Sequence, residues 1–338
     1  MSASGLTPIT VLTGFLGSGK TTLLNRLLAD PRYADTAVVV NEFGDIAIDH
    51  ALVRKASENV VLLPSGCVCC RVAGDLVQAL RDLHFARARD EVPAFRRVVL
   101  ETTGLADPAP ILATLVEMPL VAARYALAGV VTTVDGEFGA ATLDAHPEAV
   151  KQAAVADRLV LTKVDRASPE ALEALATRLA ALNPAAPLVR STLGDADPAL
   201  LLEAGLSRAG RTRTDVKRWL GEGQWRSHAP ATPAGVHDAR IRTFSWILDD
   251  PVTDDALETA VETLVDLLGD RILRLKGLVH LAGEPGPLAI HAVQHTLYPS
   301  ARLAAWHEGA RATHLVFIGR DLEESAVVPI LESFLSPA

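Results

Sequence analysis

The sequence is poor in cysteine and has no long hydrophobic run. Of its 338 residues only three are cysteine, namely Cys67, Cys69 and Cys70, and they lie within one tetrapeptide. Such close spacing argues against a disulfide framework, because no long loop would be closed. No apolar segment reaches about 18 residues without a charge, so a membrane-spanning helix is not expected. The N-terminus lacks a basic stretch followed by a long apolar run, which predicts a cytoplasmic protein without a signal peptide.

The chain also lacks an excess of positive charge. Its 32 Lys and Arg against 41 Asp and Glu give a net charge of −9. The chain as a whole therefore offers no electrostatic footprint for nucleic acid or an anionic membrane. Lysine is scarce, with six residues against 26 arginines. Since arginine cannot replace a compact ammonium at every site, the lysines are informative, and Lys20, Lys163 and Lys276 fall in motifs described below.

The first half of the chain alternates short runs of Val, Leu and Ile with helical patterns. Helices are expected, for example, over residues 21–29, 72–86 and 169–182. Strand–helix alternation predicts an α/β fold with a mostly parallel sheet and helices on both faces. The expected strands are residues 9–13, 37–40, 60–63, 97–100, 127–134, 159–162 and 188–191.

The alternation stops in the second half. Residues 211–239 contain glycine, proline and charge without a sustained period, which predicts a linker. A smaller α+β domain is expected after it, and the predicted division is an α/β domain over 1–210, the linker over 211–239 and a C-terminal domain over 240–338. The expected C-terminal strands are 241–248, 272–281, 288–294 and 314–318, and the expected helices are 253–268 and 323–334.

A phosphate-binding motif lies between the first expected strand and the first expected helix. Residues 14–21, GFLGSGKT, match G-x4-G-K-[ST] in the strand–helix context that the motif requires. Its glycines let backbone N–H groups wrap phosphates, and the helix N-terminus adds partial positive charge. Lys20 should bridge the β- and γ-phosphates, and the Thr21 hydroxyl should ligate Mg²⁺. The expected phosphate-binding residues are Gly14, Gly17, Ser18, Gly19, Lys20, Thr21 and Thr22.

A carboxylate that supports the magnesium ion is expected at the end of a neighbouring strand. The apolar run 97–100 ends at Glu101 and is followed by Thr-Thr-Gly104. Gly104 is thereby placed to contact the γ-phosphate and to sense its loss. No glutamine follows directly, so the attacking water would be positioned by Asp45, by Asp107, by the cysteine loop or by a partner. Slow intrinsic turnover is expected.

The choice of base is predicted from residues 162–165, TKVD, at another strand end. Asp165 can accept two hydrogen bonds from the N1 and N2 edge of guanine, and Lys163 would lie along the base plane. The usual guanine tetrad is N-K-x-D, and Thr162 replaces the asparagine. The position of TKVD, two strand–helix units after Glu101, favours GTP over ATP.

The three cysteines follow the strand expected to end at residue 63 and therefore lie on a strand-to-helix loop. Thiolates at i, i+2 and i+3 can converge on Zn²⁺ or Co²⁺ and leave one position for another ligand. A structural zinc knot or buried small residues are the alternative interpretations. The confinement of every cysteine to one tetrapeptide argues against mere packing.

The motifs GFLGSGKTT, NEFGD (41–45), GCVCC (66–70), ETTGLADP and TKVD occur in this order. In this the chain resembles the CobW-like family of P-loop GTPases, which handle metals and are related to the nickel-inserting urease and hydrogenase accessory GTPases. RLKG at 274–277, HAVQ at 291–294 and FIG at 317–319 are similar to that family's C-terminal domain.

The resemblance implies a GTP-dependent metallochaperone in which GTP and Mg²⁺ organise the switch segment and the cysteine loop together. It implies Cys67, Cys69 and Cys70 as metal ligands, with Glu42 or Asp45 as candidate oxygen ligands. A client metalloprotein would be the partner, and the chain would be a monomer or a nucleotide-dependent homodimer. Loss of the γ-phosphate would loosen the switch loops and any ligand that they carry.

Two other functions stay open at this point. A P-loop small-molecule kinase with a structural zinc would prefer ATP and would need an arginine-rich lid, for which the sequence offers no candidate. A regulatory GTPase with redox-sensing cysteines is the other.

The histidines and the RLKG motif contribute less to the functional prediction. His228 and His237 are expected to be solvated linker residues. His291 and His295 are expected on one face of a strand, too far apart for easy chelation, and a structural role is favoured. Lys276 is expected to contact the first domain or a client.

Overall fold

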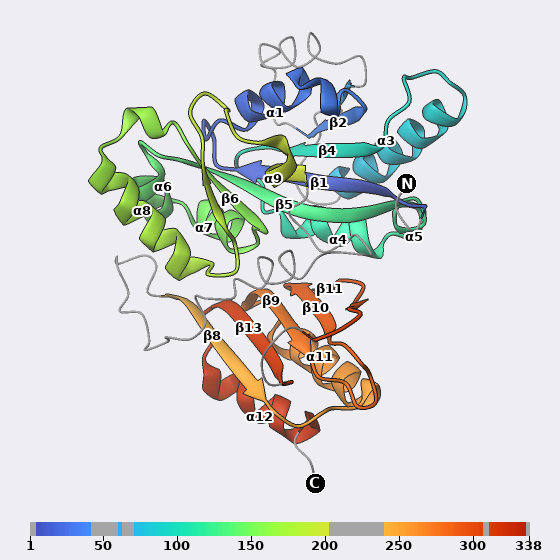
Figure 1. The fold of residues 1–338 in the computed structure, drawn as a ribbon, viewed down its shortest axis with the longest axis vertical. Coiled ribbons are helices and arrows are strands. Elements are labelled where there is room, and N and C mark those ends of the chain that lie inside the picture. Colours follow the sequence, from blue (N-terminus) through green and yellow to red (C-terminus); the bar gives the residue numbers. More distant parts are fainter. Residues whose placement is uncertain (1–4, 42–59, 63–70, 203–239, 307–310, 336–338) are drawn as a thin grey trace.

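The described residues form two sheets, one from strands between residues 7 and 190 and one from strands between residues 241 and 320 (Figure 1). The computed structural model describes residues 5–41, 60–62, 71–202, 240–306 and 311–335. The predicted linker, 211–239, lies outside these residues, so the domain boundaries stay a prediction.

The first sheet has the strand order β3-β2-β4-β1-β5-β6-β7, and every neighbouring pair is parallel. Parallel strands end at the same edge, so the loops after β1, β4, β5 and β6 meet there. This confirms the predicted α/β class. The strands are β1 (Thr7–Gly14), β2 (Thr36–Asn41), β3 (Val60–Leu62), β4 (Arg97–Thr102), β5 (Tyr125–Asp135), β6 (Arg158–Thr162) and β7 (Leu188–Arg190).

Helices cover both faces of this sheet, because its strands are apolar on both sides. Val98 and Leu100 of β4 pack into the core under α3 and α4, whereas Val99 between them packs into the core under α1. Helices α6, α7 and α8 build a third core against β5 and β6. The helices are α1 (Lys20–Ala29), α3 (Arg71–Ala88), α4 (Ala109–Glu117), α5 (Pro119–Ala122), α6 (Gly139–Ala145), α7 (Pro147–Ala154), α8 (Pro169–Leu182) and α9 (Pro198–Leu202), with 3-10 turns at Pro31–Tyr33 and Val164–Arg166.

The second sheet is antiparallel, with the order β11-β10-β9-β13-β8 and β12 beside β10. Helices α11 and α12 cover one face, and Thr253 caps α11 by accepting a hydrogen bond from the Ala256 N–H. This confirms the predicted smaller α+β domain. Its elements are β8 (Ile241–Leu248), α11 (Asp254–Leu268), β9 (Ile272–Val279), β10 (Leu288–Val293), β11 (Thr296–Leu297), β12 (Ala301–Arg302), β13 (Thr313–Arg320) and α12 (Glu324–Leu335).

The other face of the second sheet lies against helices of the first domain (Figure 1). Helix α7 contacts β9, α4 contacts β11 and α8 contacts β8. The contact is partly apolar, since Val293 and Tyr298 join the core under α3 and α4. It is also polar, with the Thr296 hydroxyl donating to Glu117 Oε1 at 2.7 Å.

A buried charge cluster, made of Asp157, Arg274 and Lys276, lies where β9 meets the end of α7. Arg274 donates to the Val155 carbonyl and to the Asp157 carboxylate, and Lys276 Nζ lies 2.9 Å from Asp157 Oδ1. The three side chains are at most 3% exposed. The expectation that Lys276 contacts the first domain is confirmed, and its scarce ammonium is used to hold the two domains together.

Burial and neighbouring charges shift the pKa values of two groups in this cluster, Lys276 and Asp157. Burial, together with the adjacent Arg274 charge, lowers the pKa of Lys276 to about 7. Burial would raise the pKa of the Asp157 carboxyl, but the Arg274 and Lys276 charges outweigh it and hold that pKa below its usual range.

The expectation that His291 and His295 share one face of a strand is wrong. Strand β10 ends at Val293, and Gln294 has a φ of 49°, in the left-handed region used for tight turns. His291 stacks on Tyr298 with ring centroids 4.3 Å apart, whereas His295 Nε2 lies 3.1 Å from Asp270 Oδ1. The chain reverses between the two rings.

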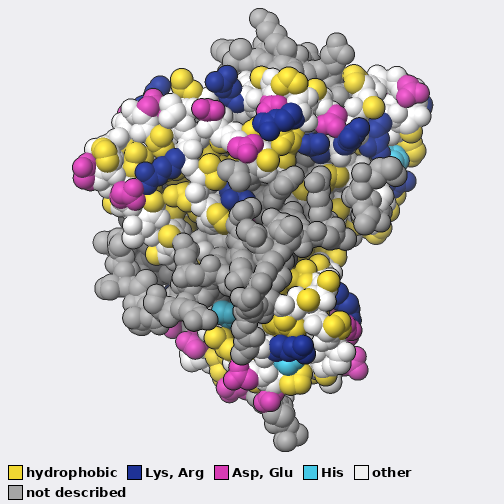
Figure 2. Space-filling model, in the orientation of Figure 1, with side chains coloured by type: hydrophobic (Ala, Val, Ile, Leu, Met, Phe, Trp, Pro, Cys, Tyr) yellow, Lys and Arg dark blue, Asp and Glu magenta, His cyan; other side chains and the backbone are white. Residues whose placement is uncertain are grey.

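Acidic and basic side chains are interspersed over the described part of the first domain on the face drawn in Figure 2. Surface pairs such as Arg89 with Glu91 and Arg190 with Glu173, each 2.6 Å apart, account for some of the abundant arginine. Such exposed pairs contribute little to stability. Across the described residues, none of the helices combines the length and the apolarity that crossing a bilayer requires.

Candidate nucleotide site

The loop between β1 and α1 has the backbone of a phosphate cradle. Gly14, Gly17 and Gly19 have φ values of 139°, 71° and 91°, which residues with a side chain rarely adopt. Gly14 also has no room for a side chain, since a Cβ there would lie 2.3 Å from Thr133 Oγ1. The buried Ser18 hydroxyl is hydrogen-bonded to Thr133 Oγ1 at 2.6 Å, which ties the loop to β5.

Two side chains at the start of α1, those of Lys20 and Thr21, reach the P-loop and the end of β4. Lys20 Nζ donates to the carbonyls of Gly14 and Phe15 at 2.9 and 3.2 Å, so it lies across the mouth of the loop. The Thr21 hydroxyl donates to Glu101 Oε1 at 2.9 Å. A hydroxyl and a carboxylate in contact are a donor set that suits Mg²⁺. Thr22, the next residue of α1, is exposed.

The segment 103–107 after β4 lies directly against the P-loop. A Cβ at Gly104 would be 2.6 Å from the Leu16 backbone nitrogen, so only glycine allows this approach. On the other side, Asp107 Oδ2 lies 2.5 Å from Lys151 Nζ, and Asp107 Oδ1 accepts a hydrogen bond from the Ala109 N–H. These two contacts hold the Asp107 carboxylate between Lys151 and the start of α4.

The TKVD segment is attached to the P-loop by its threonine. The Thr162 hydroxyl, only 3% exposed, donates to the Ser18 carbonyl at 2.7 Å and lies 3.2 Å from the Val134 carbonyl. This contact holds the TKVD segment against the P-loop. Asp165, three residues further on, is exposed to solvent.

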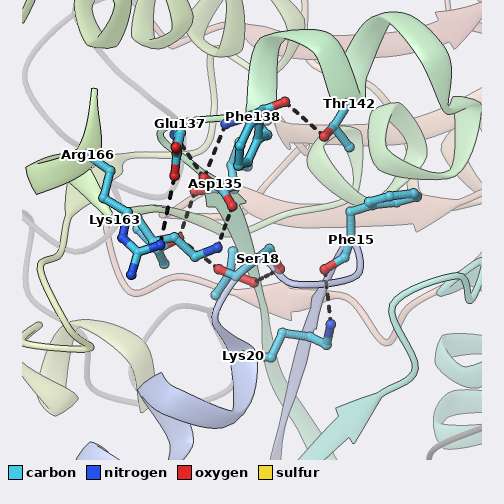
Figure 3. Close-up of polar contacts among 12 residues, drawn as sticks. Phe15, Ser18, Lys20, Asp135, Glu137, Phe138, Thr142, Lys163 and Arg166 are labelled. Atoms are coloured by element: carbon cyan, nitrogen blue, oxygen red, sulfur yellow. Dashed lines mark hydrogen bonds and ion pairs between the residues drawn. The ribbon is translucent and has the colours of Figure 1, made fainter. Parts of the chain in front are cut away.

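Lys163 has a φ of 52° and points toward the end of β5, where its Nζ lies 2.6 Å from Asp135 Oδ2 (Figure 3). Asp135 Oδ1 accepts hydrogen bonds from the backbone N–H groups of Glu137 and Phe138. Sequence reasoning did not single out Asp135. Its place directly after an apolar strand that neighbours β1, the same signal as at Glu101, could have identified it.

A cavity of ≈ 200 Å³ lies beside the P-loop. It is lined by residues 15–18 of the loop, residues 132–135 of β5, Lys163, and side chains of α6 and α7 that include Thr142 and Gln152. The P-loop residue Phe15 stacks on His146, with ring centroids 4.3 Å apart. Helices α6 and α7 therefore border the candidate nucleotide site, a placement that sequence reasoning missed.

The predicted metal ligands Cys67, Cys69, Cys70, Glu42 and Asp45 lie outside the described residues. Among the residues that the structure does describe, no group of three or more His, Cys, Asp or Glu side chains is placed to hold a metal ion. The metal site therefore stays a prediction from the sequence.

A glycine-lined loop before α1, a Thr21–Glu101 contact beneath it and a parallel sheet define a P-loop nucleotide-binding protein. Residues 8–190 match the family model of the CobW/HypB/UreG nucleotide-binding domain, and residues 241–335 match that of the cobalamin synthesis protein cobW C-terminal domain. The chain belongs to the CobW/HypB/UreG family, in the branch with a CobW C-terminal domain.

Similar proteins span nearly the whole chain. The zinc chaperone YjiA of Escherichia coli is 34% identical over 94% of this chain and 96% of its own length. The zinc chaperone CobW of Pseudomonas aeruginosa is 30% identical, with 97% and 92% covered. The crystal structure of Zn(II)-bound YjiA GTPase from E. coli is 27% identical, covers 97% of this chain and 99% of that chain, and superposes with a TM-score of 0.69. The two-domain arrangement is thus shared with a structurally known relative.

Proposed function

We propose that the chain is a GTP-binding and GTP-hydrolysing metallochaperone that binds Zn²⁺ or Co²⁺ and delivers it to a client metalloprotein. The observation that carries the nucleotide part is the hydrogen bond from Thr162 to the Ser18 carbonyl, since it holds the guanine-type TKVD segment against the P-loop. The metal part is supported by the clustered cysteines and by relatives named zinc chaperones.

Each site residue has a proposed role. The N–H groups of residues 14–22 hold the phosphates, Lys20 bridges the β- and γ-phosphates, and Gly104 contacts the γ-phosphate. Asp165 accepts hydrogen bonds from guanine, and Lys163 lies along the base. Thr21, with Glu101 behind it, would hold Mg²⁺, which supplies charge neutralisation at the phosphates when bound.

The metal would bind Cys67, Cys69 and Cys70, with Glu42 or Asp45 adding oxygen. Metal affinity should then depend on the nucleotide, because the γ-phosphate holds loops that carry ligands. Turnover without a partner should be slow, and the protein should act in the cytoplasm as a monomer or as a nucleotide-dependent homodimer.

The test compares metal affinity in two nucleotide states. Zn²⁺ and Co²⁺ are each titrated against a chromophoric chelator, with the protein loaded with Mg²⁺ and either a non-hydrolysable GTP analogue or GDP. We expect tighter binding in the GTP form, by about tenfold for a coupling of 1.4 kcal/mol. The Cys67/Cys69/Cys70→Ser variant should lose this binding.

Two controls make the result decisive. A His228→Ala/His237→Ala variant changes the linker histidines and should bind metal as the wild type does. Competition of ATP against GTP tests the base, and a preference for ATP would favour a kinase instead. Equal metal affinity in the wild type and in the cysteine variant would refute the metallochaperone proposal.

A further inference from the structure

Gln152 of α7 makes a contact that the roles described above do not include. The side chain is fully buried, and its Nε2 donates to the Gly104 carbonyl at 3.2 Å and to the Ala106 carbonyl at 3.0 Å. Its own backbone carbonyl accepts a hydrogen bond from the Thr132 hydroxyl at 2.7 Å, which attaches this turn of α7 to β5. The backbone of Gln152 is therefore attached to β5, and its side-chain Nε2 is directed at the 103–107 segment.

The 103–107 segment is enclosed between α7 and the P-loop. Lys151, the neighbour of Gln152, pairs with Asp107 at 2.5 Å. On the opposite side, Gly104 lies so close to Leu16 that a methyl group would not fit. Because the peptide unit is planar, fixing the Gly104 and Ala106 carbonyls also fixes the N–H groups of Leu105 and Asp107, and with them the backbone that follows Gly104.

We propose that Gln152 is a positioning residue for the γ-phosphate: its two donated hydrogen bonds fix the segment that distinguishes a nucleoside triphosphate from a diphosphate. The inference rests on the proposed function in one respect, namely that Gly104 contacts the γ-phosphate. It assigns to α7 a part in nucleotide discrimination, although α7 contains no P-loop, magnesium or guanine motif.

The Gln152→Glu variant tests the proposal with almost no change in shape. An ionised carboxylate accepts but cannot donate, so it would face two carbonyl oxygens and release the segment. At about pH 9.5, where the carboxyl is ionised in spite of its burial, the ratio of the Kd for GDP to the Kd for a non-hydrolysable GTP analogue should fall by at least about fivefold relative to the wild type. Overall binding of GDP should change less, because GDP lacks the γ-phosphate.

A pH series separates positioning from loss of structure. Burial raises the pKa of a carboxyl, and once protonated the group again donates one hydrogen bond. Lowering the pH from about 9.5 to 6 should therefore partly restore the ratio of the two Kd values in Gln152→Glu but not in Gln152→Leu. The neighbouring charged groups, Lys151 and Asp107 on one side and Asp135 and Lys163 across the cavity, are the same in both variants.

Asn183 provides the matched control. It is also a fully buried amide, and its Nδ2 donates at 2.9 Å to each of three carbonyls in and after α7, those of Ala153, Ala154 and Ala156, away from the 103–107 segment. Asn183→Asp should lower the melting temperature but leave the triphosphate-to-diphosphate ratio within about twofold of the wild type, since it does not touch that segment.

The outcomes distinguish this proposal from the proposed function. A wild type that prefers adenine nucleotides would refute the GTPase assignment, and the Gln152 variants would then be compared with an ATP analogue and ADP. The positioning role is overturned if Gln152→Glu changes the ratio no more than Asn183→Asp, or if Gln152→Leu recovers at low pH equally well. A wild type that binds triphosphate and diphosphate equally also overturns it.

Discussion

The Thr162 hydroxyl connects the TKVD segment, which we propose to recognise the base, to the P-loop by a hydrogen bond. Its partner is the Ser18 carbonyl, and Ser18 is itself hydrogen-bonded to Thr133 of β5. The carbonyl and the hydroxyl are both buried, so loss of the donor leaves an acceptor without water to replace it.

Thr162→Val should therefore weaken guanine-nucleotide binding by about fivefold or more, since an unsatisfied buried group costs about 1–3 kcal/mol. Thr162→Ser keeps the hydroxyl and removes the methyl group, so it should bind nearly as the wild type does. Titration with a fluorescent GDP analogue measures both. Equal affinities of the two variants would contradict the role assigned to the hydroxyl.

The close approach between the P-loop and the segment after β4 is decided by two elements together. β1 and β4 are neighbours with Leu12 opposite Glu101, so their following loops begin side by side. The missing side chain at Gly104 then lets these loops meet at van der Waals distance.

Gly104→Ala should push the two loops apart, because its Cβ would overlap the backbone of Leu16. We expect a loss of about 1–3 kcal/mol in the free energy of unfolding and weaker binding of a GTP analogue. Thermal unfolding and nucleotide titration measure the two effects.

Gly74 of α3 is the control, since a Cβ there meets nothing within 4 Å. Gly74→Ala should be neutral or should raise stability by about 0.5–1 kcal/mol, as expected for alanine in a helix. If Gly104→Ala were likewise neutral or stabilising, the contact with Leu16 would not be the reason why position 104 needs glycine.

At the scale of the whole molecule, the buried charge cluster joins the two domains through β9 and the end of α7. Breaking such a cluster is expected to be costly, because a single remaining charge is left without its partner in a dry interior. The same α7 carries Gln152, so the helix that contacts the nucleotide-site segment also contacts the C-terminal domain.

The lowered pKa of Lys276, about 7, predicts a pH-dependent stability. In the unfolded chain lysine keeps its ordinary pKa of 10.5, so between about pH 7 and 10 the unfolded state binds one more proton than the folded state. Stability should therefore rise with pH in this window, by up to about 1.4 kcal/mol per pH unit from this group. Lys276→Met should lose that slope.

Urea unfolding at several pH values between about 6 and 9.5 measures the effect. The difference between the urea midpoint of Lys276→Met and that of the wild type should be most in favour of the variant at low pH. This difference should fall as the pH rises, because only the wild type gains stability. Lys151→Met, which removes a partly exposed lysine, should keep the wild-type slope. Parallel curves for the wild type and Lys276→Met would contradict the lowered pKa.

The sequence by itself determined the features that depend only on residues adjacent in the chain. A P-loop binds phosphate with consecutive backbone groups, so residues 14–21 identify it without any tertiary information. Apolar periodicity likewise predicted the strands around Glu101 and Thr162 and the α/β class. The cysteine loop is local in the same sense, and its metal-binding role stays a prediction.

Only the tertiary structure decided which distant side chains meet. Gln152 lies 48 residues from Gly104, and Arg274 lies 117 residues from Asp157. Neither pair has a spacing or a motif that predicts contact, because the pairing depends on how α7 packs between the two sheets. The reversal between His291 and His295 was missed for a related reason, since it follows from the left-handed conformation of Gln294, a residue without a strong turn signal.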